Sequence, residues 1–449
     1  MTFTASCRPA ESVQGTSMLT QTNGKINKLD AADRSVHDWY RFVLSFPPHL
    51  VRGYLEKFGV DGSGLVLDPF CGTGTTIVEC KKQGIASIGI EANPMAHFAS
   101  TVKTSWSINP GKLITWANEI ADSASGEFER QGIADVELFD SNDGRERYEM
   151  RTLPAEQMKL LLKNSISPRP LHKTLILRDL IIGSVDRSCA AYGRLALAKS
   201  LVEDIGNLHF GPEVGVGVIK EDAPVIQSWL ANTIGMARDL ETVRPRGKTE
   251  ATVLHGDARD LSHLVRDRKF SVVFTSPPYP NEKDYTRTTR LESVLLGFIN
   301  DKSELRRMKQ HLIRSNTRNI YQQDRDEQWV KGNKRVQDLA DKIEARRIEL
   351  GKTSGFERLY ARVTRSYFGG MYRHLADLRD FLKPGAWLGY VVGDQASYLR
   401  IMIRTGQILG EIAEELGYRV ESIDLFRTRL ATATREQLNE EVLVLRWPG

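Results

Sequence analysis

The chain has 449 residues, of which 41% are hydrophobic, and this length and apolar content are enough for a large core divided over two or three domains. A formal net charge of +5 and a pI near 8.9 make it mildly basic, which permits contact with a polyanion but is not the signature of a strong nucleic-acid binder. No run approaches the roughly 18 consecutive apolar residues that a membrane-spanning helix needs.

The cysteines show neither the paired spacing of metal ligands nor a disulfide framework; they are Cys7, Cys71, Cys80 and Cys189. We therefore expect a reducing compartment, the cytoplasm, and no metal. The opening segment is rich in Ser and Thr and lacks the apolar stretch of a secretory signal. We expect residues 1–30 to form a mobile tail ahead of a folded core that begins at residue 31.

The first motif lies where the apolar run Leu65–Leu67 enters the sequence Asp-Pro-Phe-Cys-Gly-Thr-Gly-Thr-Thr at 68–76. A helix-like stretch follows at 77–83, so the pattern predicts a strand, a glycine turn and a helix. Gly72 and Gly74 let the chain turn sharply and approach a ligand without a Cβ in the way. The N-terminus of the following helix offers free N–H groups to the same ligand.

A second strand is predicted at 85–90 and ends at Glu91, 23 residues after Asp68. In doubly wound folds a carboxylate at about this distance binds ribose hydroxyls. The turn is neither a phosphate loop, which has a lysine after its glycines, nor G-x-G-x-x-G, since Ile77 replaces the third glycine. Asp68 would repel a pyrophosphate, whereas it suits a cationic amino-acid group. A ligand that carries adenosine and a positively charged methionine therefore fits best.

The stretch 106–250 separates the second and third predicted strands and is too long for an ordinary loop. It reads as mostly helical, for example at 155–163 and 193–202. We expect residues 31–105 to form the cofactor-binding part of a core that this helical insertion then interrupts. The insertion is one candidate for recognising the target.

The sheet resumes with strands predicted at 253–257 and 270–276 in a catalytic part at 251–300, and the second strand ends in Thr-Ser-Pro-Pro-Tyr. Proline fixes φ and has no N–H, so the two prolines hold an extended backbone whose carbonyls lack ladder partners. The Ser276 hydroxyl and the Pro277 carbonyl are placed to accept the protons of a planar amine, and Tyr279 offers a face on which a flat base can stack. Taken alone, this pentapeptide also fits a proline-terminated buried strand.

A second insertion at 301–368 carries alternating charges, with 13 Lys/Arg and 9 Asp/Glu between residues 301 and 350. Such a pattern is more typical of a solvated helical face than of a DNA footprint. Because the segment leaves the catalytic strand, it is nevertheless well placed to contact phosphates. The residues that could do so are Arg306, Arg307, Lys309, Arg314 and Arg318.

Residues 369–449 are predicted to complete the core with helices at 371–381 and 404–416 and three further strands. These strands are expected at 386–392, 418–426 and 442–447. Seven strands that alternate with helices predict an α/β fold with a mostly parallel sheet.

The motifs at 68–76 and 275–279 resemble those of the S-adenosylmethionine-dependent amino methyltransferases of DNA, especially the N4-cytosine type with Asp-Pro-Phe-x-Gly-x-Gly-Thr and Ser-Pro-Pro-Tyr. The segment from His37 to Leu50 is similar to the family's cofactor-covering segment, and Leu254–Asp257 to the strand whose carboxylate meets the adenine amine. The resemblance covers roughly half of the chain. It implies a Rossmann-like class I methyltransferase fold with seven strands, the last of them antiparallel.

The resemblance also implies S-adenosylmethionine as the cofactor and a role for each motif residue. The cofactor-binding residues would be Asp68, Pro69, Phe70, Gly72, Gly74 and Thr75 for the methionine part, Glu91 for the ribose and Asp257 for the adenine. The catalytic residues at the target base would be Ser276, Pro277, Pro278 and Tyr279.

The function implied is methylation of the exocyclic N4 amine of a flipped cytosine in double-stranded DNA. Its setting would be restriction–modification or self-marking in bacteria, archaea or phage, with a companion endonuclease. The cofactor motif precedes the catalytic one, which departs from the usual order for Ser-Pro-Pro-Tyr enzymes and keeps N6-adenine open. An RNA guanine-N2 methyltransferase and a non-catalytic DNA-binding protein with this fold are further alternatives. Methylation at pyrimidine C5 needs a Pro-Cys pair, which the sequence lacks.

Overall fold

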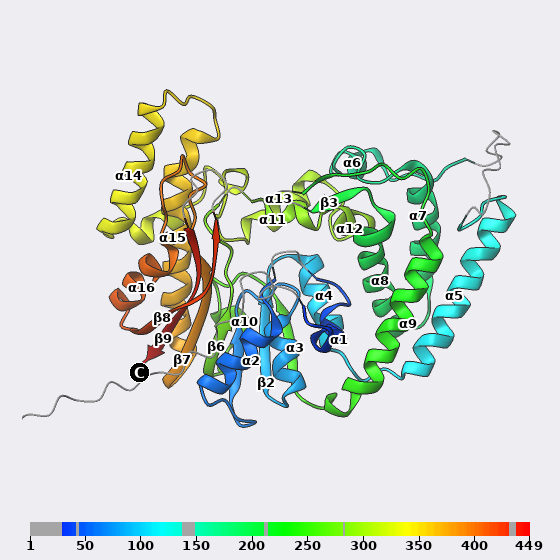
Figure 1. Ribbon diagram of the computed structural model, residues 1–449, viewed down its shortest axis with the longest axis horizontal. Coiled ribbons are helices and arrows are strands. Elements are labelled where there is room, and N and C mark those ends of the chain that lie inside the picture. Colours follow the sequence, from blue (N-terminus) through cyan, green and yellow to red (C-terminus); the bar gives the residue numbers. More distant parts are fainter. Residues whose placement is uncertain (1–28, 42–44, 137–148, 211–213, 282, 431–436) are drawn as a thin grey trace, which may run out of the picture.

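The computed structural model describes residues 29–41, 45–136, 149–210, 214–281, 283–430 and 437–449, so that all but the last two residues of the expected tail lie outside the described part. The core is a seven-stranded sheet in the order β5-β2-β1-β6-β7-β9-β8 (Figure 1). Its strands are β1 Leu65–Asp68, β2 Ala86–Glu91, β5 Ala251–His255, β6 Phe270–Thr275, β7 Leu382–Gly393, β8 Arg419–Leu430 and β9 Gln437–Trp447.

The first five of these strands pair in parallel, and β9 runs antiparallel to both of its neighbours, β7 and β8. The predicted fold class, a Rossmann-like mostly parallel seven-stranded sheet, is therefore confirmed. The short central strand β1 is fully buried at Val66 and Leu67, as expected for a parallel sheet that is covered on both faces.

Helices cover the two faces of this sheet with separate apolar cores. On one face, α2 (Pro48–Lys57) and α3 (Thr75–Lys82) pack on β1, β6 and the β7–β9 pair. On the other face, the covering helices are α10 (Ser262–Val265), α15 (Tyr360–Leu378) and α16 (Thr405–Glu415). Two helices predicted near 371–381 and 404–416 are thus present, although α15 begins eleven residues earlier than expected.

The first insertion is a helical lobe, drawn in cyan to green in Figure 1. Its long helices share a core of their own with α4 (Pro94–Thr104), in which Trp116 and Trp229 meet edge to face at 5.9 Å; they are α5 Pro110–Arg130, α7 Pro168–Gly183, α8 Arg187–Ser200 and α9 Val225–Val243. The helix predicted at 155–163 is shorter, because α6 ends at Met158, and a small hairpin of β3 (Leu208–Phe210) and β4 (Val214–Val216) was not expected.

The segment 33–41 fastens this lobe to the sheet. The Trp39 indole N–H donates to Asp239 of α9 at 2.7 Å, and His37 pairs with the buried Glu79 of α3 at 2.6 Å. The Tyr40 hydroxyl donates to Glu292, which lies on α12 (Arg290–Leu295) between β6 and the second insertion. Glu79 and Glu292 are buried, so one short segment links α3, α9 and α12, which are far apart in the sequence, through hydrogen bonds that are largely shielded from water.

The second insertion contains α13 (Lys302–Gln310), α14 (Lys334–Glu349) and several 3₁₀ turns, with α14 projecting at the upper left of Figure 1. Two of its cations do not face solvent. Arg314 is 3% exposed and makes a two-pronged ion pair with Asp324 at 2.8 Å, while Lys309 is 8% exposed and pairs with Asp284 at 2.8 Å. The prediction that Lys309 and Arg314 contact phosphates is wrong, because both charges are neutralised inside the fold.

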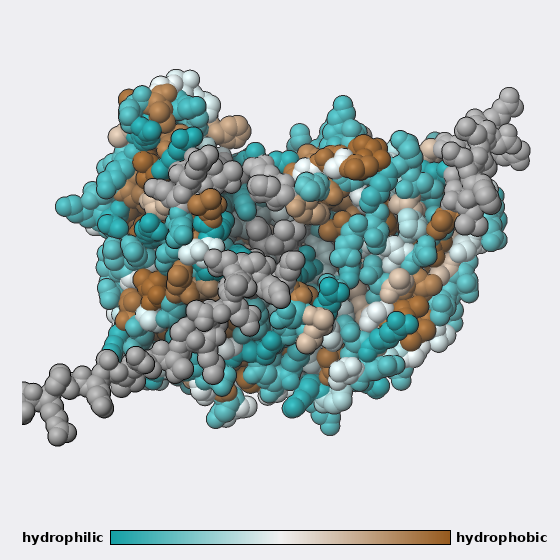
Figure 2. Space-filling model, viewed as in Figure 1, coloured by the Kyte–Doolittle hydropathy of each residue, from teal (hydrophilic) through white to brown (hydrophobic). Residues whose placement is uncertain are grey.

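Among the residues that the structure describes, no helix is long and apolar enough to cross a bilayer. On the face shown in Figure 2, hydrophilic residues predominate and hydrophobic ones lie in separate patches.

Replacing Gly369 by alanine tests how tightly the second insertion docks on α15. A Cβ at this position would overlap the backbone carbonyl of Asp326, which has little freedom to retreat. We expect a loss of about 1–3 kcal/mol in the free energy of unfolding, measured by urea denaturation. The matched control is Gly235→Ala in α9, where a Cβ meets open space and should be neutral or stabilising by about 0.5–1 kcal/mol. Equal behaviour of the two variants would contradict the tight docking.

Candidate active site

A cavity opens at the carboxyl ends of β1, β2 and β6, where ligands bind in sheets of this type. Its walls come from segments far apart in the sequence. The lining includes the turn after β1, the end of β2, the whole Ser-Pro-Pro-Tyr peptide, part of the second insertion and the β8–β9 pair.

The glycine turn has the local geometry that its sequence predicts. Gly72 and Gly74 have φ values of +52° and +84°, in the left-handed region that favours glycine, and Gly74 is the residue from which α3 starts. A Cβ at Gly74 would also lie 3.0 Å from the Cβ of Ser100. The turn therefore depends on glycine for both backbone conformation and space.

The residues of this turn do not all face the cavity. Pro69, Phe70, Gly72 and Thr75 line it, whereas Asp68 and Gly74 lie behind the lining. The Asp68 carboxylate is fully buried, and one of its oxygens accepts hydrogen bonds from the Thr275 hydroxyl at 2.6 Å and the Phe70 N–H at 3.2 Å. Its second oxygen has no hydrogen-bond partner among the described residues. Burial raises the pKa of Asp68 to about 6, although these hydrogen bonds oppose the rise.

Glu91 lies at the end of β2 and does face the cavity. Its two carboxylate oxygens accept backbone N–H groups, from Gly72 at 2.8 Å and from Asn93 at 2.7 Å. Burial raises the pKa of Glu91 to about 7, and the backbone hydrogen bonds oppose that rise. The carboxylate is thus held rigidly beside the glycine turn, with lone pairs left to accept from hydroxyl groups of a ligand.

Asp257 follows β5, and its neighbours Gly256 and Ala258 line the cavity while its own side chain turns aside. The carboxylate accepts from the Arg259 guanidinium through Nε at 2.9 Å and Nη2 at 2.5 Å, and also from the Arg259 backbone N–H at 2.9 Å. The Asp257 carboxylate is therefore largely occupied by a cation that the sequence reasoning did not single out.

All four residues of the Ser-Pro-Pro-Tyr peptide line the cavity. The Ser276 hydroxyl donates to the Val391 carbonyl of β7 at 3.1 Å, which leaves its lone pairs free to accept. The Tyr279 ring packs against Gly393, where an added Cβ would lie 2.8 Å from the ring. The Tyr279 backbone N–H donates to the Tyr285 hydroxyl at 3.3 Å. The Ser-Pro-Pro-Tyr peptide, which we call the shelf, thus contacts both β7 and the short helix α11 (Tyr285–Thr288) that follows the shelf in the chain.

A buried histidine supports the cavity floor. His374 of α15 contacts the Ala258 carbonyl through Nδ1 at 2.7 Å and the Tyr390 hydroxyl through Nε2 at 2.8 Å, and it meets the Phe70 ring edge to face at 5.0 Å. Burial lowers the pKa of His374 to about 4, so the ring is neutral at physiological pH. The neutral His374 ring then donates from Nδ1 and accepts at Nε2. It thereby connects α15 with the turn after β5, with Tyr390 of β7 and with Phe70 of the glycine turn.

Further lining residues lie outside the two motifs. They come from the covering segment, from the stretch after the Ser-Pro-Pro-Tyr peptide, from the second insertion and from the β8–β9 pair. They are Ser45, Phe46, Asn281, Lys283, Asp284, Tyr285, His311, Asn316, Asn319, Phe426, Arg427, Arg429 and Glu440. Cys71 also touches the cavity, and burial raises the pKa of its thiol well above the ordinary value. A thiol that stays protonated is a packing group and not a nucleophile.

Comparisons with known proteins agree with this geometry. A family model described as DNA methylase matches residues 21–100. The type II methyltransferase M.BsoBI from Geobacillus stearothermophilus is 25% identical over 90% of this chain and 82% of its own length. The type II methyltransferase M.AvaI from Anabaena variabilis is 23% identical over 91% and 86%. An rRNA methyltransferase from Streptomyces viridochromogenes aligns over 94% of both chains at 10% identity, but its TM-score of 0.34 carries no weight.

The sheet and the cavity at its carboxyl edge define a Rossmann-like methyltransferase. Within that class, the DNA methylase match and the type II methyltransferase relatives support the DNA amino-methyltransferase family.

Replacing Thr275 by valine tests the hydrogen bond that joins the two motifs. The variant removes the donor to Asp68 and should reduce the free energy of unfolding by about 1–3 kcal/mol. Because burial already raises the Asp68 pKa to about 6, the native state holds its proton longer than the unfolded chain, and stability falls as pH rises from about 4 through 6. Thr275→Val should raise this pKa further, so its cost should be larger at pH 8 than at pH 5.

The control for this experiment is Thr364→Val in α15, where the buried hydroxyl donates to the Tyr360 carbonyl and no carboxylate takes part. Its cost should not change between the two pH values. If Thr275→Val were equally insensitive to pH, the coupling to Asp68 would be wrong.

Proposed function

We propose that the protein is an S-adenosylmethionine-dependent DNA methyltransferase that acts on the N4 amine of cytosine. One observation carries this proposal: the two acceptors of the Ser-Pro-Pro-Tyr shelf and the Tyr279 ring face the same cavity as the glycine turn and Glu91. A single cavity thus offers separate places for a nucleoside cofactor and for a flat base with an exocyclic amine.

The residues present fit this cofactor. Glu91 is a fixed acceptor suited to ribose hydroxyls, and the open backbone at Gly72 permits close approach of the methionine part. The buried Asp68, with one carboxylate oxygen unpartnered among the described residues, supplies negative potential behind the turn where a cationic ligand is expected. When bound, S-adenosylmethionine would supply the methyl group as an electrophile.

The shelf supplies what an amine on a base ring lacks. Its lone pair is delocalised into the ring, so the nitrogen is a poor nucleophile. The Ser276 hydroxyl and the Pro277 carbonyl, which both line the cavity, would accept the two N–H protons and so favour tetrahedral geometry at nitrogen. Tyr279 would hold the ring by stacking, which also offsets the cost of about a few kcal/mol for extruding a base from the duplex.

We favour cytosine because of the residue at position 276. In the family that the motifs resemble, Ser before Pro-Pro-Tyr is typical of cytosine N4 enzymes, whereas Asn or Asp there is typical of adenine N6 enzymes. Adenine N6 is the second candidate, and the observation in its favour is that the cofactor motif precedes the catalytic one in the chain. The relatives are named as type II methyltransferases, which supports a role as the modification enzyme of a restriction–modification pair. Its substrate would then be double-stranded DNA, with an endonuclease of the same sequence specificity as companion.

Methylation of mixed-sequence duplex DNA tests this proposal directly. The protein would be incubated with S-adenosylmethionine labelled in its methyl group, and the DNA digested to nucleosides for mass spectrometry. We expect labelled N4-methylcytosine. The Ser276→Ala variant lacks one acceptor for the amine protons, so its turnover should be about 10²- to 10³-fold lower. Labelled N6-methyladenine would overturn the assignment of the base, and label in RNA alone would overturn DNA as the substrate.

Tyr279→Ala tests the stacking role. Loss of a base–aromatic stack is worth about 1–3 kcal/mol, so turnover should fall about 10- to 100-fold while the Kd for S-adenosylmethionine stays within about threefold. Tyr279→Phe keeps the ring and should retain most of the turnover. Parallel losses of cofactor binding and turnover in Tyr279→Ala would show that the ring supports the cavity as a whole and does not bind the base.

A further inference from the structure

Arg259 is a buried cation that no motif explains. It follows β5 by four residues, is 5% exposed, and holds the Asp257 carboxylate through Nε and Nη2. Burial alone would lower the pKa of Arg259, but its carboxylate partners hold it above the ordinary value, so the guanidinium keeps its charge.

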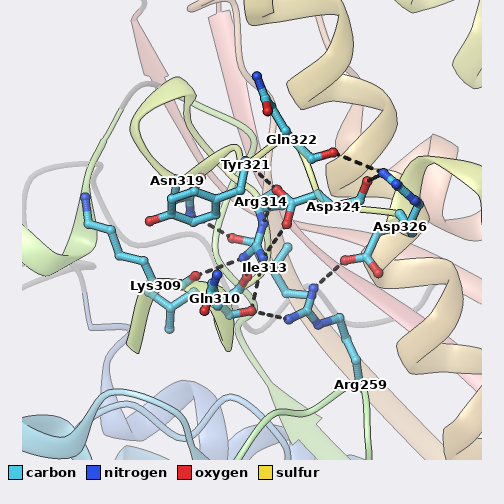
Figure 3. Close-up of polar contacts among 12 residues, drawn as sticks. Arg259, Lys309, Gln310, Ile313, Arg314, Asn319, Tyr321, Gln322, Asp324 and Asp326 are labelled. Atoms are coloured by element: carbon cyan, nitrogen blue, oxygen red, sulfur yellow. Dashed lines mark hydrogen bonds and ion pairs between the residues drawn. The ribbon is translucent and has the colours of Figure 1, made fainter. Parts of the chain in front are cut away.

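The same guanidinium also binds the second insertion. Nη1 donates to the Asp326 carboxylate, and Nη2 donates to the Gln310 carbonyl at 2.9 Å (Figure 3). We call residues 310–326 the wall segment, because it forms one wall of the cavity. The cavity-lining residues of this segment are His311, Leu312, Ile313, Ser315, Asn316 and Asn319.

The far end of this link is anchored in the core. The backbone of Asp326 packs directly on Gly369 of α15, and its second carboxylate oxygen lies 3.6 Å from Arg373 of the same helix. Asp326 is itself 6% exposed. Two carboxylates, from the turn after β5 and from the wall segment, therefore meet on one guanidinium. Without it, Asp257 would lose this ion pair and the buried Asp326 would keep only the longer contact with Arg373.

We propose that Arg259 is a positioning residue that ties the turn after β5, whose Gly256 and Ala258 line the cavity, to the wall segment and so fixes this edge of the cofactor pocket. The proposal rests on the proposed function, since the ligand expected in this cavity is S-adenosylmethionine. A carboxylate that is held by a planar two-pronged donor loses its rotational freedom, so the position of the turn that carries Asp257 depends on what holds the guanidinium from behind. Asp326 therefore contributes to cofactor affinity although it does not line the cavity.

The wall segment provides a matched control. Asp324 lies two residues from Asp326 and is similarly buried, at 8% exposure, in an ion pair with Arg314. Arg314 also donates to the Gln310 carbonyl, at 3.1 Å, so both pairs fasten the same segment. Only the Asp326 pair reaches Asp257. A purely structural role predicts equal effects of Asp324→Asn and Asp326→Asn on cofactor binding.

The experiment measures the Kd of S-adenosylmethionine by isothermal titration calorimetry, and Tm without cofactor, for the wild type and both variants. We expect Asp326→Asn to raise Kd about tenfold and Asp324→Asn to change it less than threefold, at a comparable loss of Tm. Arg259→Lys, which keeps the charge but not the two-pronged geometry, should raise Kd like Asp326→Asn.

Equal changes in Kd for Asp324→Asn and Asp326→Asn, or an unchanged Kd in Arg259→Lys, would overturn the positioning role. These results leave the proposed function intact, because they are read from cofactor binding and not from the base that is methylated. If the wild type bound no S-adenosylmethionine, the proposed function itself would be wrong, and the role of Arg259 would fall with it.

Discussion

The pairing of β1 with β6 is the constraint on which the site depends. These neighbours in the middle of the sheet are separated by about 200 residues of sequence, and they pair in parallel at Val66–Val272 and Leu67–Val273. Just past this register, the Thr275 hydroxyl donates to Asp68 and the Thr76 hydroxyl donates to the Phe274 carbonyl. Hydrogen bonds thus join the strand ends from which the glycine turn and the Ser-Pro-Pro-Tyr shelf begin. A shift of one residue in register would turn one of the two motifs away from the cavity.

The two long insertions contribute to the site in different ways. The helical lobe is fastened to the sheet by the 33–41 segment, whose hydrogen-bond partners come from α3, α9 and α12. The second insertion enters the cavity wall itself and is fixed there by the Arg259–Asp326 and Arg314–Asp324 pairs. Removing one partner of such a pair leaves the other charge buried without compensation, which lowers the free energy of unfolding by about 3–5 kcal/mol. Their value here is in holding a long connection in one arrangement at the edge of a binding site.

How far the sequence predicts this molecule follows from the range of the interactions involved. The seven strands, the left-handed glycines and the position of Glu91 are encoded locally, by apolar runs and by turn residues, and the structure contains them as expected. Asp68 and Asp257 were predicted at strand ends, where they lie, but their side chains turn away from the cavity lining because Thr275 and Arg259 hold them. Those partners are fixed by tertiary packing and hydrogen bonding, which strand periodicity alone does not encode.

The charges of the second insertion also depend on tertiary partners that its local sequence does not reveal. Counting its Lys and Arg residues overstates the positive surface, since Lys309 and Arg314 are neutralised by buried carboxylates, while Arg306 and Arg318 remain exposed. Affinity for a polyanion depends on the cations that can replace counterions at phosphates, and buried pairs cannot. The positive charge that this insertion can offer to a polyanion is therefore smaller than its count of Lys and Arg indicates.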